Sequence, residues 1–197
     1  RKMHIRAIEE SGLTAADEML YPENWGYVSD ILSYVAIGAR SVEDQQHRIV
    51  VSGFDIPAGM KNPTSGNLTV MLNSVHASQH PHSFIYRGWE VQTNGNELAH
   101  TVLRGATNKH GGNIPNYHYE DLNLLLTLYN ERDLKNPAAI IDTNHSNSNK
   151  QFEQQIRIVK EIMHSRKLSP DIHKLVKGVM IESYIEEGCQ KVGGGVY

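Results

Sequence analysis

Apolar and polar residues follow one another along the chain in two kinds of segment: stretches with helical spacing, and short unbroken apolar runs. Helical spacing, in which apolar residues recur every three or four positions, predicts helices over residues 1–11, 22–32, 41–51, 67–75, 119–131 and 150–166. Apolar runs between them predict strands over residues 15–20, 34–39, 56–60, 97–103, 139–142 and 176–181. Strands and helices therefore take turns along most of the chain.

Capping residues support the boundaries of these helices. Gly12 follows the first helix, where glycine ends many helices, and Ser41 and Asn67 are side chains that cap helix N-termini. In the last helix the spacing predicts four core-facing residues, namely Phe152, Ile156, Val159 and Met163. Each helix thus has an apolar face to bury.

One segment interrupts this order. Residues 84–92 and 97–103 flank the dipeptide Asn94-Gly95, which is typical of tight hairpin turns. We expect residues 84–103 to form an inserted β-hairpin, whose second arm runs straight into the strand that ends at Arg104.

Repeated strand-then-helix units predict right-handed parallel crossovers, and therefore an α/β sheet or barrel. About six strands can be counted, whereas a (β/α)8 TIM barrel has eight strands and typically ~250 residues. The sequence opens on a helix and has no helix after its last strand. We expect residues 1–197 to form a single catalytic domain, a TIM barrel represented without its first two strands and its closing helix.

Composition and charge argue against several classes of function. With 197 residues, 39% of them hydrophobic, the chain can bury one substantial core. The formal net charge of -3 argues against binding of nucleic acid. No apolar run approaches the ~20 residues that span a bilayer, so no membrane partner is expected. The single cysteine, Cys189, fits a reducing and therefore cytoplasmic location.

Five apolar runs each end on a residue that can bind an anion or a metal ion. These residues are Arg40, Lys61, Arg104, His145 and Glu182. In barrel enzymes the catalytic groups lie at the C-terminal ends of the parallel strands. The pattern therefore predicts an active site at that end of the sheet.

Arg40, Lys61 and Arg104 suit a small anionic ligand. An arginine fork matches the oxygens of phosphate or carboxylate, and a lysine provides a compact positive charge. Each of the three alone would be an ordinary surface cation, but three in the same topological position favour a binding site. Gly38 and Ala39 precede Arg40, and their backbone N–H groups can approach an anion.

The polar run that begins at Asp142 contains an imidazole suited to a divalent metal ion, that of His145. Glu182 ends the neighbouring predicted strand at the same face. Together they supply two of the three or four protein ligands that a catalytic metal site needs. Glu18 also ends a strand at this face and can orient a basic residue or a water molecule, although an ordinary solvated carboxylate fits the sequence equally well.

Other residues are of types that form metal, phosphate or nucleophile sites, but their surroundings in the sequence do not fit such sites. Three histidines with zinc-like spacing, at positions 76, 80 and 82, lie between a helix and a strand, which places them at the opposite face of a barrel. The glycines at 193–195 lack the lysine and the helix of a phosphate-binding loop. Cys189 has no paired histidine motif. We expect no catalytic role for these residues.

Five motifs resemble those of a known family: IGARSVEDQQHR, GMKNPTSG, HTVLRGA, IIDTNHSNSNKQ and GVMIESYIEEGCQ. They are similar to the successive motifs of type I 3-deoxy-D-arabino-heptulosonate 7-phosphate (DAHP) synthases, over nearly the whole chain. The resemblance implies a (β/α)8 transferase that condenses phosphoenolpyruvate with erythrose 4-phosphate, the first step of the shikimate pathway of aromatic amino-acid biosynthesis. It also implies one divalent metal ion, with manganese, iron, cobalt and zinc all suited.

The resemblance further implies roles for single residues at the phosphoenolpyruvate site. Arg40 and Arg104 would hold the phosphate, with help from the backbone amide of Ala39. Lys61 would contact the carboxylate, and Glu18 would support the phosphate site through water.

By the same resemblance the metal site would be half present. His145 and Glu182 would bind the metal ion, and Lys61 and His145 are the residues expected to take part in catalysis. The family's cysteine ligand and its Lys-Pro-Arg-Thr-Ser motif, which binds erythrose 4-phosphate, are expected before Arg1, and its aspartate ligand beyond Tyr197. The chain alone is therefore expected to be catalytically incomplete.

The resemblance implies partners as well as substrates. Family members form homo-oligomers and bind feedback-inhibiting aromatic amino acids at the hairpin, so both are expected here. Two alternatives stay open: a 3-deoxy-octulosonate 8-phosphate synthase, which shares the barrel and a similar phosphoenolpyruvate site, and a catalytically incomplete fragment that retains only the anion site. The hairpin favours the heptulosonate enzyme.

Overall fold

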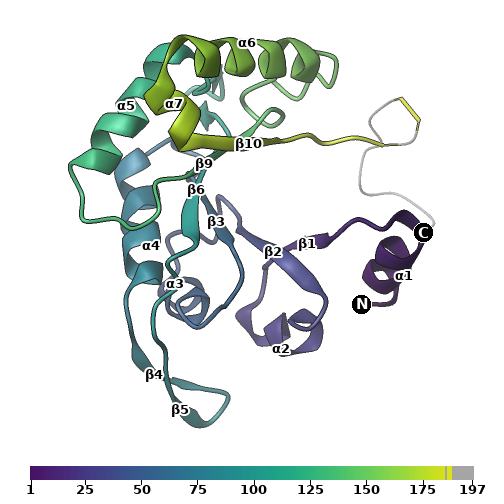
Figure 1. The fold of residues 1–197 in the computed structure, drawn as a ribbon, viewed down its shortest axis with the longest axis vertical. Helices are drawn as coiled ribbons and strands as arrows, with labels where there is room; N and C mark the ends of the chain where they lie inside the picture. The colour runs from purple at the N-terminus through teal and green to yellow at the C-terminus, as the bar shows by residue number, and fades with distance from the viewer. Residues whose placement is uncertain (185, 188–197) are drawn as a thin grey trace.

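The core of the molecule is a six-stranded parallel sheet. The computed structural model describes residues 1–184 and 186–187 (Figure 1). The strands occur in the order β1 (Ala15–Glu18), β2 (Leu32–Ile37), β3 (Ala58–Lys61), β6 (Ala99–Leu103), β9 (Ala139–Asp142) and β10 (Val176–Met180). Each strand pairs in parallel with the next one along the chain. This is the order of a barrel wall, whereas a doubly wound sheet reverses its order part of the way across.

Most helices cover the outer side of the curved sheet, whereas α1 (Lys2–Ser11) lies beside the edge strand β1 (Figure 1). The covering elements are the 3-10 turn η1 (Pro22–Asn24), α2 (Trp25–Val28), α3 (Gln45–Val51), α4 (Leu68–Gln79), α5 (Tyr119–Asn130), α6 (Gln154–Leu168) and α7 (Pro170–Leu175). The structure confirms the predicted α/β architecture, a curved parallel sheet with helices that matches part of a TIM barrel. In the portion of the chain that the structure describes, no helix is both long and apolar enough to cross a membrane.

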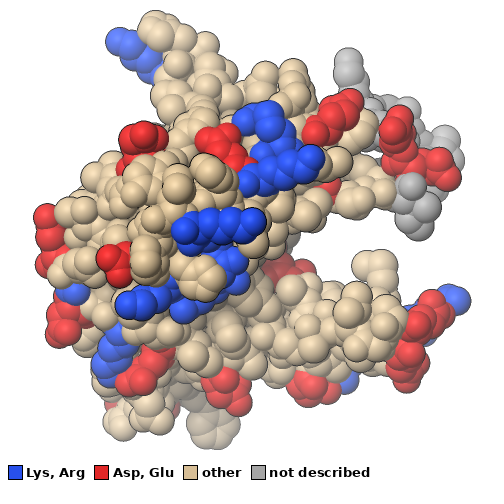
Figure 2. Space-filling view, turned by 45° about the horizontal axis from the view of Figure 1, so that its top comes forward, with Lys and Arg blue, Asp and Glu red and all other residues tan. Residues whose placement is uncertain are grey.

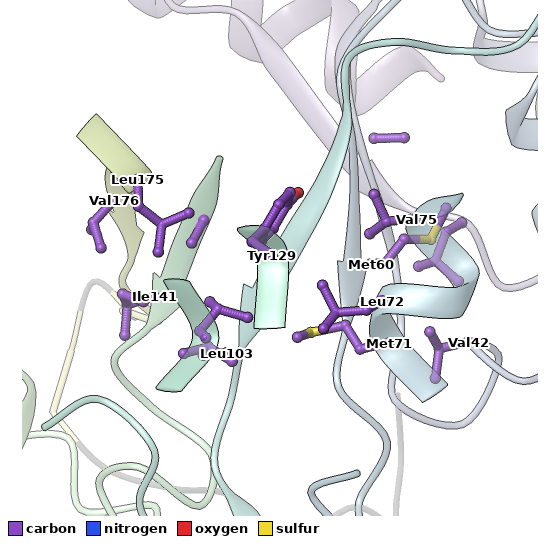
Figure 3. Packing of buried hydrophobic residues seen from close by; sticks show 14 of the residues in the cluster. Val42, Met60, Met71, Leu72, Val75, Leu103, Tyr129, Ile141, Leu175 and Val176 are labelled. Atoms are coloured by element: carbon purple, nitrogen blue, oxygen red, sulfur yellow. The ribbon is translucent and has the colours of Figure 1, made fainter. Parts of the chain in front are cut away.

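The hydrophobic core fills the space between the sheet and the helices. Figure 3 shows Met60 of β3 near Leu72 and Val75 of α4, and all three side chains are fully buried. Fully buried side chains of the other strands include Ile37, Leu103 and Ile141. These apolar residues face the helices, which leaves the alternate positions of each strand to face the concave side of the sheet, where the polar residues described below lie.

The predicted inner face of the last long helix is wrong. In α6 the buried residues are Gln155, Ile158, Ile162 and Ser165. Ile156 is 67% exposed, and Phe152 and Met163 are each 41% exposed. The helix begins at Gln154. The face of α6 that packs against the core carries Ile158 and Ile162, and it differs from the face that the apolar spacing predicts. Several apolar residues of α6 therefore point outward.

Two isoleucines of α6 provide a direct test of this orientation. Ile158 is fully buried, whereas Ile156, two positions earlier, is mostly exposed. We expect Ile158→Ala to lower the free energy of unfolding by about 2–5 kcal/mol, because it leaves a cavity in the core. Ile156→Ala should change it by less than about 0.5 kcal/mol. Urea-induced unfolding of both variants measures the difference, and equal effects would contradict the described face of α6.

The β-hairpin is shorter than predicted and has a different turn. Strands β4 (Ser83–Tyr86) and β5 (Trp89–Gln92) pair antiparallel. The two residues between them, Arg87 and Gly88, have φ values of 51° and 82°. Two consecutive positive φ angles are the geometry of a type I′ turn, whose twist matches that of paired strands.

The prediction that Asn94-Gly95 is the hairpin turn and that residues 97–103 form its second arm is wrong. Strand β6 (Ala99–Leu103) pairs in parallel with β3 and β9, and all five of its residues are buried. An unbroken buried run suits an interior strand of a parallel sheet rather than a hairpin arm. Gly95 serves another purpose: its φ is 87°, and a Cβ there would lie 2.3 Å from the carbonyl oxygen of Gln79.

Two helix predictions are corrected as well. Helix α3 begins at Gln45 rather than after Ser41, because the carboxylate of Asp44 accepts the backbone N–H of His47 at 3.1 Å and caps the helix there. The predicted helix over 22–32 is a 3-10 turn followed by one short helix, and the last residue of that range already belongs to β2. Two further short strands, β7 (Ala106–Thr107) and β8 (Asn113–Ile114), pair beyond the end of β6.

Candidate active site

The C-terminal ends of the parallel strands gather most of the polar residues singled out by the sequence. β1, β3 and β9 end on Glu18, Lys61 and Asp142, and Arg104 follows β6 directly. The remaining candidates, Ala39, Arg40, His145 and Glu182, follow within three residues of a strand end. Figure 2 shows basic side chains gathered on one face of the molecule with acidic ones beside them. The structure places these groups at one end of the sheet, while their roles stay predictions.

Asp142 is the centre of the polar contacts at this end of the sheet. It is 1% exposed, and its Oδ2 lies 3.3 Å from Nζ of Lys61 and 2.8 Å from Nδ1 of His145. Its Oδ1 accepts the backbone N–H of Asn144 at 3.0 Å. Burial alone would raise the pKa of this carboxyl, but the contacts with His145, Lys61 and Asn144 outweigh burial and hold the pKa below its ordinary value. Asp142 is therefore an anion at neutral pH.

His145 lies between two carboxylates. Its Nδ1 faces Asp142, and its Nε2 lies 3.5 Å from Oε1 of Glu182. The other oxygen of Glu182, Oε2, accepts the side-chain amide of Asn144. His145 has a φ of 47°, a left-handed conformation that is uncommon for residues other than glycine and that helps to set the direction of its ring. If the proton sits on Nδ1, as the contact with Asp142 favours, the lone pair of Nε2 and Oε1 of Glu182 face the same space.

This donor set fits a divalent metal ion in part. An imidazole nitrogen and a carboxylate oxygen suit manganese, iron, cobalt or zinc. Metal-binding histidines usually have their other nitrogen bound by a carboxylate, as Asp142 binds His145. Within residues 1–184 and 186–187, no three His, Cys, Asp or Glu side chains are grouped to hold a metal ion. His145 and Glu182 thus form at most half of a site in the described chain.

Two of the three histidines near the end of α4 contact the backbone through their rings. Nδ1 of His80 lies 2.7 Å from the carbonyl oxygen of His76, and Nε2 of His82 lies 2.7 Å from that of Ala77. Carbonyl acceptors require protonated ring nitrogens, so these atoms are not free to bind a metal ion. Cys189 and the glycines at 193–195 lie outside the described residues.

Lys61 and Arg104 are buried cations. Lys61 is 7% exposed, and its Nζ lies 3.3 Å from Asp142 and 3.9 Å from Oε2 of Glu18. Arg104 is 8% exposed, and its buried Nη1 has no hydrogen-bond partner among the described residues. Burial lowers the pKa of Arg104, with Arg40 nearby acting in the same direction and Asp142 against it. A buried donor without an acceptor is unfavourable, so Arg104 is poised to bind an anion from outside the chain.

Glu18 lies across the start of the loop that carries Arg40. A Cβ on Gly38 would lie 2.1 Å from Oε1 of Glu18, so glycine is needed for the carboxylate to come this close. The same carboxylate reaches Lys61, which agrees with the prediction that Glu18 can orient a basic residue. Ala39 is half-buried and Arg40 is exposed beside this contact. The side chain of Arg40 is therefore accessible to a ligand.

Three asparagines that the sequence had not marked tie the loops of the site together. We call Asn62, Asn116 and Asn147 the amide scaffold. Oδ1 of Asn62 accepts the backbone N–H of Arg104 at 2.9 Å and the amide of Asn116 at 3.1 Å. Oδ1 of Asn147 accepts the backbone N–H of Asn116 at 2.9 Å, and its Nδ2 donates to the carbonyl of Asp142 at 2.7 Å. The scaffold therefore joins the loops after β3, β6 and β9.

Gly105 lets these loops approach one another. Its φ is 76°, and a Cβ there would lie 2.7 Å from the backbone nitrogen of Asn147. We expect Gly105→Ala to lower the free energy of unfolding by about 2–4 kcal/mol, from backbone strain and overpacking, and to displace Arg104. Gly111→Ala is the matched control, since Gly111 has a φ of 83° with open space around it and should cost about 1 kcal/mol. Urea-induced unfolding tests both, and equal losses would show that the approach of the loops is unimportant.

Comparisons with known proteins identify the family of the chain. Residues 2–196 match the sequence model of the DAHP synthetase I family. The chain is 36% identical over 195 residues to the Tyr-sensitive phospho-2-dehydro-3-deoxyheptonate aldolase of Escherichia coli K12, covering 96% of the chain and 52% of that protein. It is 32% identical over 201 residues to the Trp-sensitive aldolase of Shigella flexneri, with coverages of 99% and 54%.

A solved structure shares the fold. The phospho-2-dehydro-3-deoxyheptonate aldolase of Francisella tularensis SCHU S4 has a TM-score of 0.82 and 32% sequence identity, over 93% of this chain and 52% of that one. The chain thus spans about half the length of the relatives that it matches. The sequence match and the shared fold show that the chain belongs to the DAHP synthetase I family.

Proposed function

We propose that this chain forms the phosphoenolpyruvate-binding part of a DAHP synthase, which condenses phosphoenolpyruvate with erythrose 4-phosphate to give 3-deoxy-D-arabino-heptulosonate 7-phosphate and phosphate. The observation that carries the proposal is the buried guanidinium of Arg104, which has an unpartnered Nη1 and lies at the same strand ends as Lys61. A cation in this state favours an anionic ligand. Family membership supplies the identity of that anion.

In the proposed reaction, C3 of phosphoenolpyruvate bonds to the aldehyde carbon of erythrose 4-phosphate, water adds at C2, and phosphate leaves by C–O cleavage. Arg104 and Arg40, with the amide of Ala39, would bind the phosphate and stabilise it as it departs. Lys61 would bind the carboxylate, and the contact of its Nζ with Asp142 holds the side chain in place.

His145 and Glu182 are the residues of this chain that would hold a divalent metal ion. When bound, such an ion supplies Lewis-acid polarisation of the aldehyde. The contacts of Asp142 with His145 and of Asn144 with Glu182 orient the two donors toward each other. Further ligands would come from outside the described residues.

The architecture extends the proposal. We propose that the six parallel strands belong to an eight-stranded barrel whose first two strands and closing helix lie outside this sequence.

A cytoplasmic homo-oligomer inhibited by an aromatic amino acid is part of the same proposal. The names of two relatives, Tyr-sensitive and Trp-sensitive, support the inhibition. Adding phenylalanine, tyrosine or tryptophan in turn to the assay below would identify the inhibitor.

The activity is tested with the full natural protein, phosphoenolpyruvate, and either erythrose 4-phosphate or arabinose 5-phosphate. We expect phosphate release and heptulosonate phosphate formation with erythrose 4-phosphate alone. Turnover only with arabinose 5-phosphate would point to a 3-deoxy-octulosonate 8-phosphate synthase. Binding of phosphoenolpyruvate without turnover of either sugar would point to a protein that retains only the anion site.

A further inference from the structure

Gln155 is a buried amide on the apolar face of α6. It is 4% exposed, and the next core positions of the helix are the fully buried Ile158 and Ile162. An amide in such surroundings is costly unless its donor and acceptor are both satisfied. The hydrogen-bond partners of the Gln155 amide therefore indicate its structural role.

Gln155 binds the backbone of Glu182 at two points. Its Nε2 donates to the carbonyl oxygen of Glu182 at 2.7 Å, and its Oε1 accepts the N–H of Glu182 at 3.0 Å. Oε1 also accepts the hydroxyl of Thr143 at 3.1 Å. Glu182 lies two residues beyond the end of β10, past the strand's last backbone contact, in which the N–H of Thr143 donates to Met180. The Gln155 side chain thus provides the two backbone hydrogen bonds that a neighbouring strand would otherwise make with Glu182.

This contact fixes the backbone from which the Glu182 carboxylate extends. The carboxylate itself is 58% exposed, and its Oε2 is bound by Asn144 while Oε1 faces Nε2 of His145 at 3.5 Å. An exposed carboxylate on a free chain segment would sample many positions. Anchoring of the backbone at both its N–H and its carbonyl removes most of that freedom.

We propose that Gln155 is a positioning residue of the metal site: by holding the backbone of Glu182, it places the carboxylate opposite His145 and so sets the affinity for a divalent metal ion. The inference rests on the proposed function, since it takes His145 and Glu182 as metal ligands. Residues that orient metal ligands typically contribute 10–100-fold to metal affinity. Gln155 acts only through Glu182 and touches no metal ion or substrate.

The test is titration of the full natural protein with Mn²⁺ alone, with free Mn²⁺ measured by electron paramagnetic resonance. Gln155→Met, which keeps the length of the side chain and removes its hydrogen bonds to Glu182 and Thr143, should raise the Kd for Mn²⁺ about 10–100-fold. Gln154→Met is the matched control: Gln154 is the adjacent residue of α6, and its side chain accepts only from Nε of Arg157 among the contacts of the described chain. It should leave the Kd unchanged.

A double-mutant cycle separates positioning from a general structural role. In a Glu182→Ala background the Gln155→Met substitution should have almost no further effect on the Kd, because its target is gone. An equal increase in both backgrounds would overturn the proposal. If Gln155→Met does not fold, Gln155→Asn replaces it, since that variant keeps the amide group but is one methylene too short to reach both the N–H and the carbonyl of Glu182. A wild-type Kd in folded Gln155→Asn would also overturn the proposal.

The same titrations distinguish two kinds of failure. If Glu182→Ala and His145→Ala leave Mn²⁺ binding unchanged, the proposed metal site is wrong, and the role of Gln155 fails with it. If both weaken binding while folded Gln155→Met binds Mn²⁺ as tightly as the wild type, the metal site stands and only the inference about Gln155 is overturned.

Discussion

Arg104→Ala is expected to raise the apparent Michaelis constant for phosphoenolpyruvate by about two orders of magnitude or more in the full natural protein. Truncating one partner of a buried charge pair costs about 2–5 kcal/mol of binding free energy. The same substitution should leave the free energy of unfolding unchanged or higher. In the free protein the Nη1 of Arg104 is buried without a hydrogen-bond partner among the described residues, so its removal relieves an unfavourable group.

These opposite effects on binding and stability separate a ligand-binding arginine from a structural one. Arg104→Lys keeps the charge but loses the planar fork, so it should fall between wild type and Arg104→Ala. Arg6→Ala on α1 is the control, because the side chain of Arg6 is 78% exposed and, among the described residues, pairs only with Glu10. Steady-state kinetics and thermal unfolding provide the two measurements. An unchanged Michaelis constant in Arg104→Ala would remove Arg104 from the site.

Asp142→Asn is expected to reduce both activity and stability. The substitution takes the negative charge from the buried Lys61 and gives His145 an amide in place of a carboxylate. Removing one partner of a buried ion pair typically costs about 3–5 kcal/mol, because the other charge is left uncompensated. We expect a loss of that size in the free energy of unfolding, together with a fall in kcat of about 10³-fold or more, since both predicted catalytic residues lose their orientation.

An exposed ion pair provides the matched control for Asp142→Asn. Asp171 lies 3.9 Å from Lys174 on the surface of α7, and both side chains are more than half exposed. Asp171→Asn should change the free energy of unfolding by less than about 1 kcal/mol and leave kcat as it is. Urea-induced unfolding and turnover measurements compare the two variants. Similar small effects in both would mean that Asp142 is not the centre of the site.

The strand ends could be predicted well because two independent signals mark them. In a parallel sheet covered by helices the strand interiors are apolar, and the first polar residue after the run marks the end that carries the chemistry. Strand β9 was predicted with the bounds that the structure shows. Lys61 and Arg104 also lie at the ends of their strands, as expected.

The contacts within the site could not be predicted in the same way. Asp142 was visible as the last residue of a strand, but its position between Lys61 and His145 depends on how three strands align. Asn62 and Gln155 act through backbone groups of loops far away in sequence, and an asparagine or glutamine has no spacing that marks such a partner. The only available signal was that Asn62 follows directly after a predicted cationic residue at a strand end.

Two wrong predictions, the hairpin turn at Asn94-Gly95 and the buried face of α6, have a common cause. Asn94-Gly95 has the local preference of a hairpin turn, yet the strand after it gains more by pairing on both edges within the main sheet. Ile156 has the local spacing of a core residue, yet the sheet covers the face that carries Ile158. In both cases tertiary pairing and packing override a local preference.

The amide scaffold has a consequence for how the site responds to solution conditions. Asn62, Asn116 and Asn147 carry no charge and do not titrate, so the hydrogen bonds that join the three loops are insensitive to pH and only weakly screened by salt. An ionisable group such as Asp142 fixes a local contact within its own loop, with the N–H of Asn144, whereas the uncharged scaffold joins one loop to another. A change in pH or salt should therefore leave these joining hydrogen bonds in place, even where it alters the contacts of Asp142.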